Sequence, residues 1–277
     1  MIRNFIYNMN KGNKKINITA EFVSIMRVKQ DPKNLYFVSQ KGKRFFDLAR
    51  RIFSEKKLND IFEWRLILSK IFDDKILKDR PEQVIDLAAG YSLRGFNECL
   101  RNRDLIYIDI DFDSVISRKK LVLNEICVKE NIVFPQNYFL ISADVLKTDI
   151  FDNIKKIVIK NKKTLIIAEG LTSYFGLDDF QLFLENIKAL IGNFDCAEFY
   201  SNESIKQPKG LVHYVLRYIF VSLLTRSKHG VRFKSEKEFE IFLDGQGIHE
   251  YKITNIMGFV MYSISNNKIV RQNQFGM

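Results

Sequence analysis

The chain has 277 residues, of which 46% are hydrophobic, 28% charged and 13% aromatic, a composition that excludes a disordered or low-complexity protein. Its length suits either two domains or one large α/β unit with additions, and we favour the second. The formal net charge is +11, and residues 1–80 hold most of the excess, with 19 Lys and Arg against 9 Asp and Glu. Such a basic segment can attract nucleic acid, an acidic membrane surface or an anionic substrate, or be only a solvated surface.

Cysteine spacing and hydropathy indicate a cytoplasmic protein. The cysteines Cys99, Cys127 and Cys196 lie far apart, so neither a disulfide framework nor a zinc site is expected. The first twenty residues lack an apolar segment followed by a small-residue cleavage site, so we expect no signal peptide. The apolar stretch 212–224 is interrupted by a His and an Arg and is shorter than the roughly 20 residues that a bilayer requires.

Helices are predicted before the first strand. Residues 45–53 and 60–77 carry apolar side chains at spacings of three and four, which is typical of amphipathic helices. Pro81 then ends the helical pattern, and the apolar run 83–90 with its small residues predicts a strand followed by a turn.

Strand-like and helix-like segments alternate through the middle of the chain. This alternation predicts a parallel sheet with helices on both faces. The expected strands are 83–90, 105–111, 137–145, 164–171 and 195–202, and the expected helices between them are 114–130 and 178–192.

The last part of the chain follows a different pattern. Residues 251–265 contain two strand-like runs divided by Met257 and Gly258, which predicts a hairpin at the end of the sheet. Helices are expected at 209–226, which is apolar on nearly all sides, and at 235–247. We interpret 209–226 as a buried lid or subunit contact, with a membrane-surface role as the alternative.

Candidate site residues follow the strands, where open α/β sheets bind their ligands. Gly90 closes the first strand in a tight turn, but the turn lacks the G-x-G-x-x-G pattern of dinucleotide-binding sites. Asp109, Asp111 and Asp113 alternate at the end of the second strand, where a carboxylate can accept both hydroxyl groups of a ribose. A solvated acidic turn is the alternative.

Two further carboxylates end later strands. Asp144 can accept a hydrogen bond from an exocyclic amine such as that of adenine, or it can cap the following helix. Glu169 ends the fourth strand, where an unpaired buried carboxylate would cost several kcal/mol. Its partner is therefore expected to be an ammonium or sulfonium group of a ligand, or an arginine such as Arg65 or Arg94.

Four segments together resemble the class I S-adenosylmethionine-dependent methyltransferases. Within that class they are most similar to the leucine carboxyl methyltransferase and polyketide O-methyltransferase group. The resemblance covers about residues 83–175, and its motifs are VIDLAAGYSLRG (84–95), YIDIDFDSVISRKK (107–120), ISADV (141–145) and IIAEGLTSYF (166–175). It implies a doubly wound, seven-stranded, mostly parallel sheet of the Rossmann-like type.

The resemblance also implies roles for residues in the first two motifs. Asp86 and Gly90 match the turn that holds the methionine part of the cofactor, and Arg94 matches the Arg of the motif D-T-R. Asp111 matches the Asp of E-x-D, the expected ribose ligand, with Asp109 in the place of the Glu.

In the later motifs, Asp144 matches the acidic position beside adenine, while Glu169 and Tyr174 match E-G-L-x-x-Y beside the methyl donor, where we expect the catalytic residues. Arg65 matches, more loosely, an upstream Arg that holds the cofactor carboxylate. The sequence departs from the family pattern in the first turn, where Ala88 replaces a Gly and Ser92 and Leu93 replace the Asp and Thr of D-T-R.

These patterns predict an S-adenosylmethionine-dependent methyltransferase that acts on a carboxylate or hydroxyl of a small molecule or peptide. Residues 1–80 are expected to form part of the substrate pocket or its lid, and residues 81–277 the cofactor-binding domain, with an insert at about 203–234. The three histidines have no metal-ligand spacing, so no metal is expected. The alternatives are an RNA-binding or RNA-modifying protein that uses the basic N-terminal region, and a non-catalytic relative.

Overall fold

The computed structural model describes residues 14–52, 55–147, 150–203, 205 and 233–267. The predicted helix 209–226 and most of the insert predicted at 203–234 therefore lie outside the described residues. Among the described helices, none is both long and apolar enough to cross a membrane.

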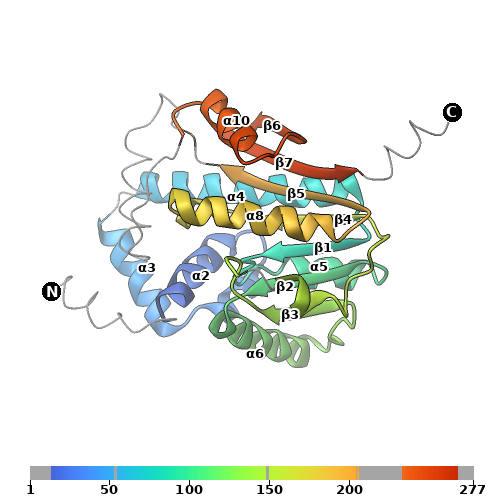
Figure 1. Ribbon diagram of the computed structural model, residues 1–277. Helices are drawn as coiled ribbons and strands as arrows, with labels where there is room; N and C mark the ends of the chain where they lie inside the picture. The colour runs from blue at the N-terminus through green and yellow to red at the C-terminus, as the bar shows by residue number, and fades with distance from the viewer. Residues whose placement is uncertain (1–13, 53–54, 148–149, 204, 206–232, 268–277) are drawn as a thin grey trace.

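A single mixed sheet of seven strands organises the fold (Figure 1), in the order β3-β2-β1-β4-β5-β7-β6. The first five strands pair in parallel and alternate with helices, whereas β7 is antiparallel to both β5 and β6. This arrangement confirms the predicted doubly wound sheet. The strands are β1 (Gln83–Leu87), β2 (Ile106–Asp111), β3 (Tyr138–Ser142), β4 (Thr164–Ala168), β5 (Cys196–Glu203), β6 (Tyr251–Ile256) and β7 (Phe259–Asn267).

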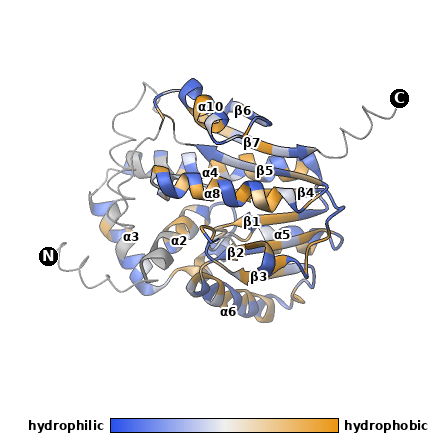
Figure 2. Cartoon of the chain, in the orientation of Figure 1, coloured by the Kyte–Doolittle hydropathy of each residue, from blue (hydrophilic) through white to orange (hydrophobic). Residues whose placement is uncertain are grey.

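Both faces of the sheet are covered by helices, so its central strands are apolar on both sides (Figure 2). Every residue of β1 and of β4 is buried, as expected for parallel strands between two helical layers. One face packs against α4 (Glu55–Asp79), α5 (Arg94–Arg101) and α6 (Asp113–Glu130). The other packs against α7 (Ile150–Ile154), α8 (Leu177–Gly192) and α10 (Glu236–Gly245).

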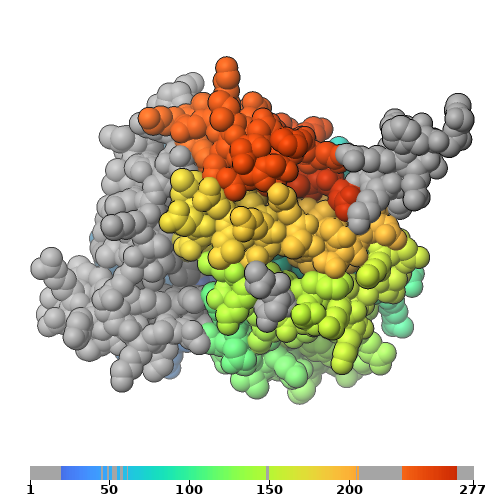
Figure 3. Space-filling view, viewed as in Figure 1, coloured from blue at the N-terminus to red at the C-terminus, as the bar shows by residue number. Residues whose placement is uncertain are grey.

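The C-terminal hairpin closes one edge of the sheet, as predicted. In the space-filling view (Figure 3), the surface of α8 continues into that of α10 and the hairpin, coloured orange to red. Met257 and Gly258 form the two-residue turn, and both have positive φ, 52° and 84°. Two positive φ values are typical of the turns whose twist suits a two-residue hairpin.

Two N-terminal helices pack beside α4, and a short 3₁₀ helix joins them. These helices are α2 (Lys14–Arg27) and α3 (Gln40–Ile52), and the 3₁₀ helix is η1 (Pro32–Phe37). Aromatic rings join the three long helices, since Phe46 of α3 lies 6.1 Å from Phe22 of α2 and 5.8 Å from Phe62 of α4 between ring centroids. This packing sets α2 against the body of the protein near the carboxyl ends of the strands.

Candidate active site

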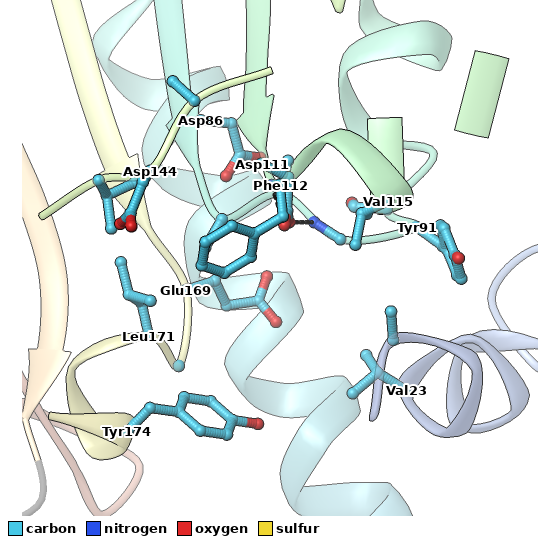
Figure 4. Close-up of a pocket in the computed structure, with 18 of the residues that line it drawn as sticks. Val23, Asp86, Tyr91, Asp111, Phe112, Val115, Asp144, Glu169, Leu171 and Tyr174 are labelled. Atoms are coloured by element: carbon cyan, nitrogen blue, oxygen red, sulfur yellow. Dashed lines mark hydrogen bonds between the residues drawn. The ribbon is translucent and has the colours of Figure 1, made fainter. Parts of the chain in front are cut away.

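A pocket of about 480 Å³ lies at the carboxyl ends of β1, β2 and β4. Its volume is within the range of about 300–1,000 Å³ that is typical of small-molecule sites. The turns after these strands line it together with α2 and α4, and 3₁₀ helix η2 (Thr172–Tyr174) forms part of the wall (Figure 4). Of the nine residues to which the resemblance gives a role, eight line this pocket, namely Arg65, Asp86, Gly90, Arg94, Asp111, Asp144, Glu169 and Tyr174.

The turn after β1 needs glycine because of its backbone conformation. Gly90 has a φ of +55°, which side chains disfavour, although the nearest atom to an added Cβ, that of Ala20, would be 3.9 Å away. In this conformation the backbone N–H of Gly90 donates to Asp111 Oδ2 at 2.7 Å. The turn after β1 is thereby tied to the end of β2.

Asp111 faces the pocket with a carboxylate that the backbone holds in place. Its Oδ1 accepts from the N–H of Phe112 at 2.7 Å, so each oxygen accepts one backbone hydrogen bond. A carboxylate oxygen can accept two hydrogen bonds, so both oxygens keep acceptor capacity for a ligand. Burial raises the pKa of Asp111 to about 6, although the two N–H donors lower it.

Asp109 is the predicted site residue that the structure does not bring to the pocket lining. Its side chain is 1% exposed, and its Oδ2 accepts from Lys119 Nζ of α6 and from the hydroxyl of Tyr138. Asp109 and Asp111 share one face of β2, as the sequence indicated, but α6 covers the inner of the two. Asp109 therefore lies beneath the pocket, in a buried ion pair.

Three arginines converge on Glu169. Arg94 Nη2 and Arg27 Nη2 donate to its two oxygens at 2.6 and 2.7 Å, and Arg65 Nη2 lies 3.6 Å from Oε1. Burial alone would raise the pKa of Glu169, but the three guanidinium groups hold it well below its ordinary range. Gly170 makes room for this cluster, because an added Cβ there would lie 2.6 Å from Arg65 Nη1. The arginine partners anticipated for Glu169 are thus present.

Arg94 links this cluster to the end of β1. Its Nε donates to Asp73 of α4 at 2.5 Å, and its Nη1 lies 3.5 Å from Asp86 Oδ2. The hydroxyl of Tyr107 also donates to Asp86 Oδ2, at 3.0 Å. Burial raises the pKa of Asp86 to about 7, against the opposing effect of Arg94.

The part of the pocket lining around Asp144 and Tyr174 combines apolar and polar groups. Phe112 and Leu171 present apolar side chains near Asp144, and the Tyr174 hydroxyl points toward the space that Glu169 and Val23 also face (Figure 4). Asp144 Oδ1 accepts from the N–H of Leu146 at 3.0 Å, which fixes its orientation. This hydrogen bond closes a turn and does not cap a helix, because the next helix, α7, begins at Ile150.

Apart from Arg65, the sequence did not identify which residues of the N-terminal region line the pocket. Ala20, Val23 and Arg27 all line the pocket from α2. Arg27 is 7% exposed, and its Nε has no hydrogen-bond partner among the described residues. No sequence motif surrounds Arg27; its position depends on the packing of α2 against the strand ends.

The pocket fits the cofactor that the sequence motifs imply. A ribose needs hydroxyl acceptors, and Asp111 offers two oxygens at the end of β2. An amino-acid carboxylate needs cationic donors, and Arg27 offers an unpartnered, buried Nε beside Arg65 and Arg94. A buried guanidinium donor without an acceptor costs free energy, so an anionic group is the expected occupant.

Comparison with solved structures identifies similar folds. A putative O-methyltransferase from Nostoc punctiforme PCC 73102 aligns with a TM-score of 0.51 at 14% identity over 71% of this chain and 55% of that protein. An O-methyltransferase family protein from Burkholderia thailandensis aligns with a TM-score of 0.50 at 11% identity over 77% of this chain and 60% of that protein. This chain thus spans little more than half of either relative. At these identities the likeness shows the fold alone.

Comparison with protein families gives a more specific result. No curated protein matches the chain. The family model described as leucine carboxyl methyltransferase, in contrast, matches residues 23–188, which include the end of α2, all of α4 and the first four strands. This match contains every pocket residue predicted from the sequence, and it does not favour the RNA-binding alternative. The chain therefore belongs to the leucine carboxyl methyltransferase family of S-adenosylmethionine-dependent methyltransferases.

Proposed function

We propose that this protein transfers the methyl group of S-adenosylmethionine to an oxygen atom, and that this oxygen belongs to a carboxylate on a small molecule or peptide. The observation that carries the proposal is the combination, in one pocket, of a ribose-type carboxylate, Asp111, with the three arginines around Glu169. Family membership and the position at the strand ends support the same function.

The pocket residues divide the binding of the cofactor among them. Asp111 accepts the ribose hydroxyl groups, and Asp144 accepts from the adenine amine. Arg27 and Arg65 bind the amino-acid carboxylate, while the carboxyl group of Asp86 faces the ammonium group. Phe112 and Leu171 contact the base. These assignments follow the charge and position of each side chain in the pocket lining.

When bound, the cofactor supplies an activated methyl group on a sulfonium. For methyl transfer, a lone pair of the acceptor oxygen would have to form the O–C bond while the C–S bond broke, with the C–S bonding pair remaining on sulfur. This direct displacement requires the acceptor oxygen, the methyl carbon and the sulfur to lie in line, so the protein contributes mainly positioning and exclusion of water.

The state of Glu169, the carboxylate expected beside the methyl donor, supports a carboxylate acceptor over a hydroxyl. A hydroxyl needs a general base, but Glu169 is held by guanidinium groups and its pKa is far too low for that role. A carboxylate is already ionised at neutral pH and needs no base. We infer that Glu169 acts by holding Arg27 and Arg94, and that Tyr174 directs its hydroxyl toward the acceptor oxygen.

A transfer assay with radiolabelled S-adenosylmethionine tests this proposal. The purified protein is incubated with panels of carboxylic acids, free peptides and phenols, and each product is then treated with mild base. Methyl esters release volatile methanol under these conditions, whereas methyl ethers do not. Base-labile label that depends on Asp111 supports the proposal. Base-stable label would show that the acceptor atom is not a carboxylate oxygen, and base-stable label on the phenols would indicate hydroxyl methylation.

A further inference from the structure

A fully buried ion pair lies directly beneath the pocket. Lys119 of α6 donates from Nζ to Asp109 Oδ2 of β2, and the two side chains are 0% and 1% exposed. The hydroxyl of Tyr138 on β3 donates to the same oxygen. One carboxylate thus joins a helix and two strands, while its Oδ1 has no partner among the described residues.

Stability alone does not account for this pair. Removing two charges from water costs several kcal/mol per ion, and replacing such a pair with apolar side chains is often neutral or stabilising. Buried pairs can instead fix the register of the elements that they join, because each charge is stable only beside its partner. The residues that depend on this ion pair are therefore those on the elements that it joins, β2 and α6.

The segment between Asp109 and Lys119 contains three residues of the pocket lining, Asp111, Phe112 and Val115. It includes the end of β2 and the first turns of α6. Asp111 links the turn after β2 to the turn after β1, because its carboxylate accepts from the N–H groups of both Phe112 and Gly90. The ion pair therefore joins the two ends of the segment that contains Asp111, the carboxylate expected to bind the ribose.

We propose that Asp109 and Lys119 are positioning residues: their buried pair anchors α6 to β2 and so holds the Asp111 carboxylate where it can accept both ribose hydroxyl groups. This inference rests on the cofactor binding proposed above. It assigns a role to the one predicted site residue that does not reach the pocket lining. Lys119 also opposes the effect of burial on the Asp111 carboxyl, lowering its pKa.

The expected signature is a loss of selectivity for the ribose hydroxyl groups. The wild-type protein should bind S-adenosylhomocysteine roughly ten- to a hundredfold more tightly than its 2′,3′-dideoxy analogue, as hydrogen bonds to a charged group imply. The double variant Asp109→Leu/Lys119→Met removes both charges together and leaves neither one unpaired. We expect its preference to fall below about threefold, because the end of β2 that carries Asp111 is no longer anchored to α6 by the ion pair.

Calorimetric titration of both ligands into each folded variant measures this ratio, with thermal unfolding as the check on folding. Lys120→Met is the matched control, since Lys120 is exposed on the same helix, and it should keep the wild-type ratio. Tyr138→Phe is a milder variant that removes one donor to Asp109 and no charge. It should give an intermediate ratio even where the double variant does not fold.

The outcomes separate the two proposals. If neither the wild type nor Asp111→Ala distinguishes the two ligands, the ribose assignment is wrong and the positioning role falls with it. If the wild type discriminates, Asp111→Ala does not, and the ion-pair variants keep the full ratio, only the positioning role is overturned. A purely structural pair would weaken both ligands equally and leave the ratio unchanged.

Discussion

At the scale of single residues, the carboxylates in and beneath the pocket differ most in how their charges are balanced. Asp111 is held by two backbone N–H groups, Glu169 by arginines and Asp109 by a lysine. Asp111 and Asp86 have pKa values raised to about 6 and about 7, whereas that of Glu169 is lowered. The first two therefore titrate in the pH range where binding can be measured, and Glu169 does not.

We predict that cofactor affinity falls as pH decreases through about 6. Asp111 accepts hydroxyl groups as a carboxylate, and below its pKa the protonated form predominates, so affinity declines progressively as the pH falls below about 6. Titrations with S-adenosylhomocysteine between pH 5 and 8.5, including Asp111→Asn and Asp86→Asn, locate the step. A step near pH 6 that persists in Asp111→Asn would show that another group controls it.

Removing the charge of Glu169 should destabilise the protein strongly. In Glu169→Gln, the buried Arg27 and Arg94 lose their acceptor charge, a change that costs about 3–5 kcal/mol for buried ion pairs. Urea unfolding without cofactor measures this loss. Glu125→Gln, which breaks an exposed pair with Lys129, should leave the unfolding free energy essentially unchanged. Equal stability of the two variants would contradict the buried arrangement.

At the scale of elements, the sequence predicted strands more completely than it predicted contacts between helices and the pocket. Apolar runs of five to eight residues identified the strands, and each candidate carboxylate stood where a strand ended. The alternation along β2 placed Asp109 and Asp111 on one face but could not say which of them α6 covers. That distinction depends on Lys119, whose sequence position resembles that of any lysine on an amphipathic helix.

The hairpin turn offers a test of local backbone strain. Met257 adopts a φ of 52° and is 70% exposed, although turns of this type favour Asn or Gly at that position. Met257→Asn should therefore stabilise the protein by about 1 kcal/mol, measured by urea unfolding. Met257→Ala keeps the unfavourable conformation and serves as the control. Equal free energies of unfolding for Met257→Asn and Met257→Ala would argue against this turn geometry.

At the scale of the whole molecule, the N-terminal helices and the sheet form one site together. We propose that residues 1–80 supply a pocket wall, because Ala20, Val23, Arg27 and Arg65 all line it. Sequence analysis could assign this role only through Arg65 and the resemblance. No sequence motif marks Arg27, and its contact with Glu169 joins residues that lie 142 positions apart in the chain. Such contacts become visible only once α2 is packed.

Arg27 should therefore determine affinity for the amino-acid part of the cofactor. We predict that Arg27→Gln weakens S-adenosylhomocysteine binding roughly tenfold or more, because a hydrogen bond between charged groups is lost. It should leave 5′-methylthioadenosine, which lacks the amino-acid group, nearly unaffected. Arg44→Gln, on the exposed surface of α3, is the control. Equal weakening of both ligands in Arg27→Gln would place the amino-acid group elsewhere.

The most direct test of the account is calorimetric titration of S-adenosylhomocysteine into the wild-type protein and into Asp111→Ala. Asp104→Ala, which alters an exposed carboxylate before β2, is the matched control. We predict micromolar binding by the wild type and the control, and its loss in Asp111→Ala. Absence of binding by the folded wild type, or unchanged binding by Asp111→Ala, would contradict the cofactor site proposed here.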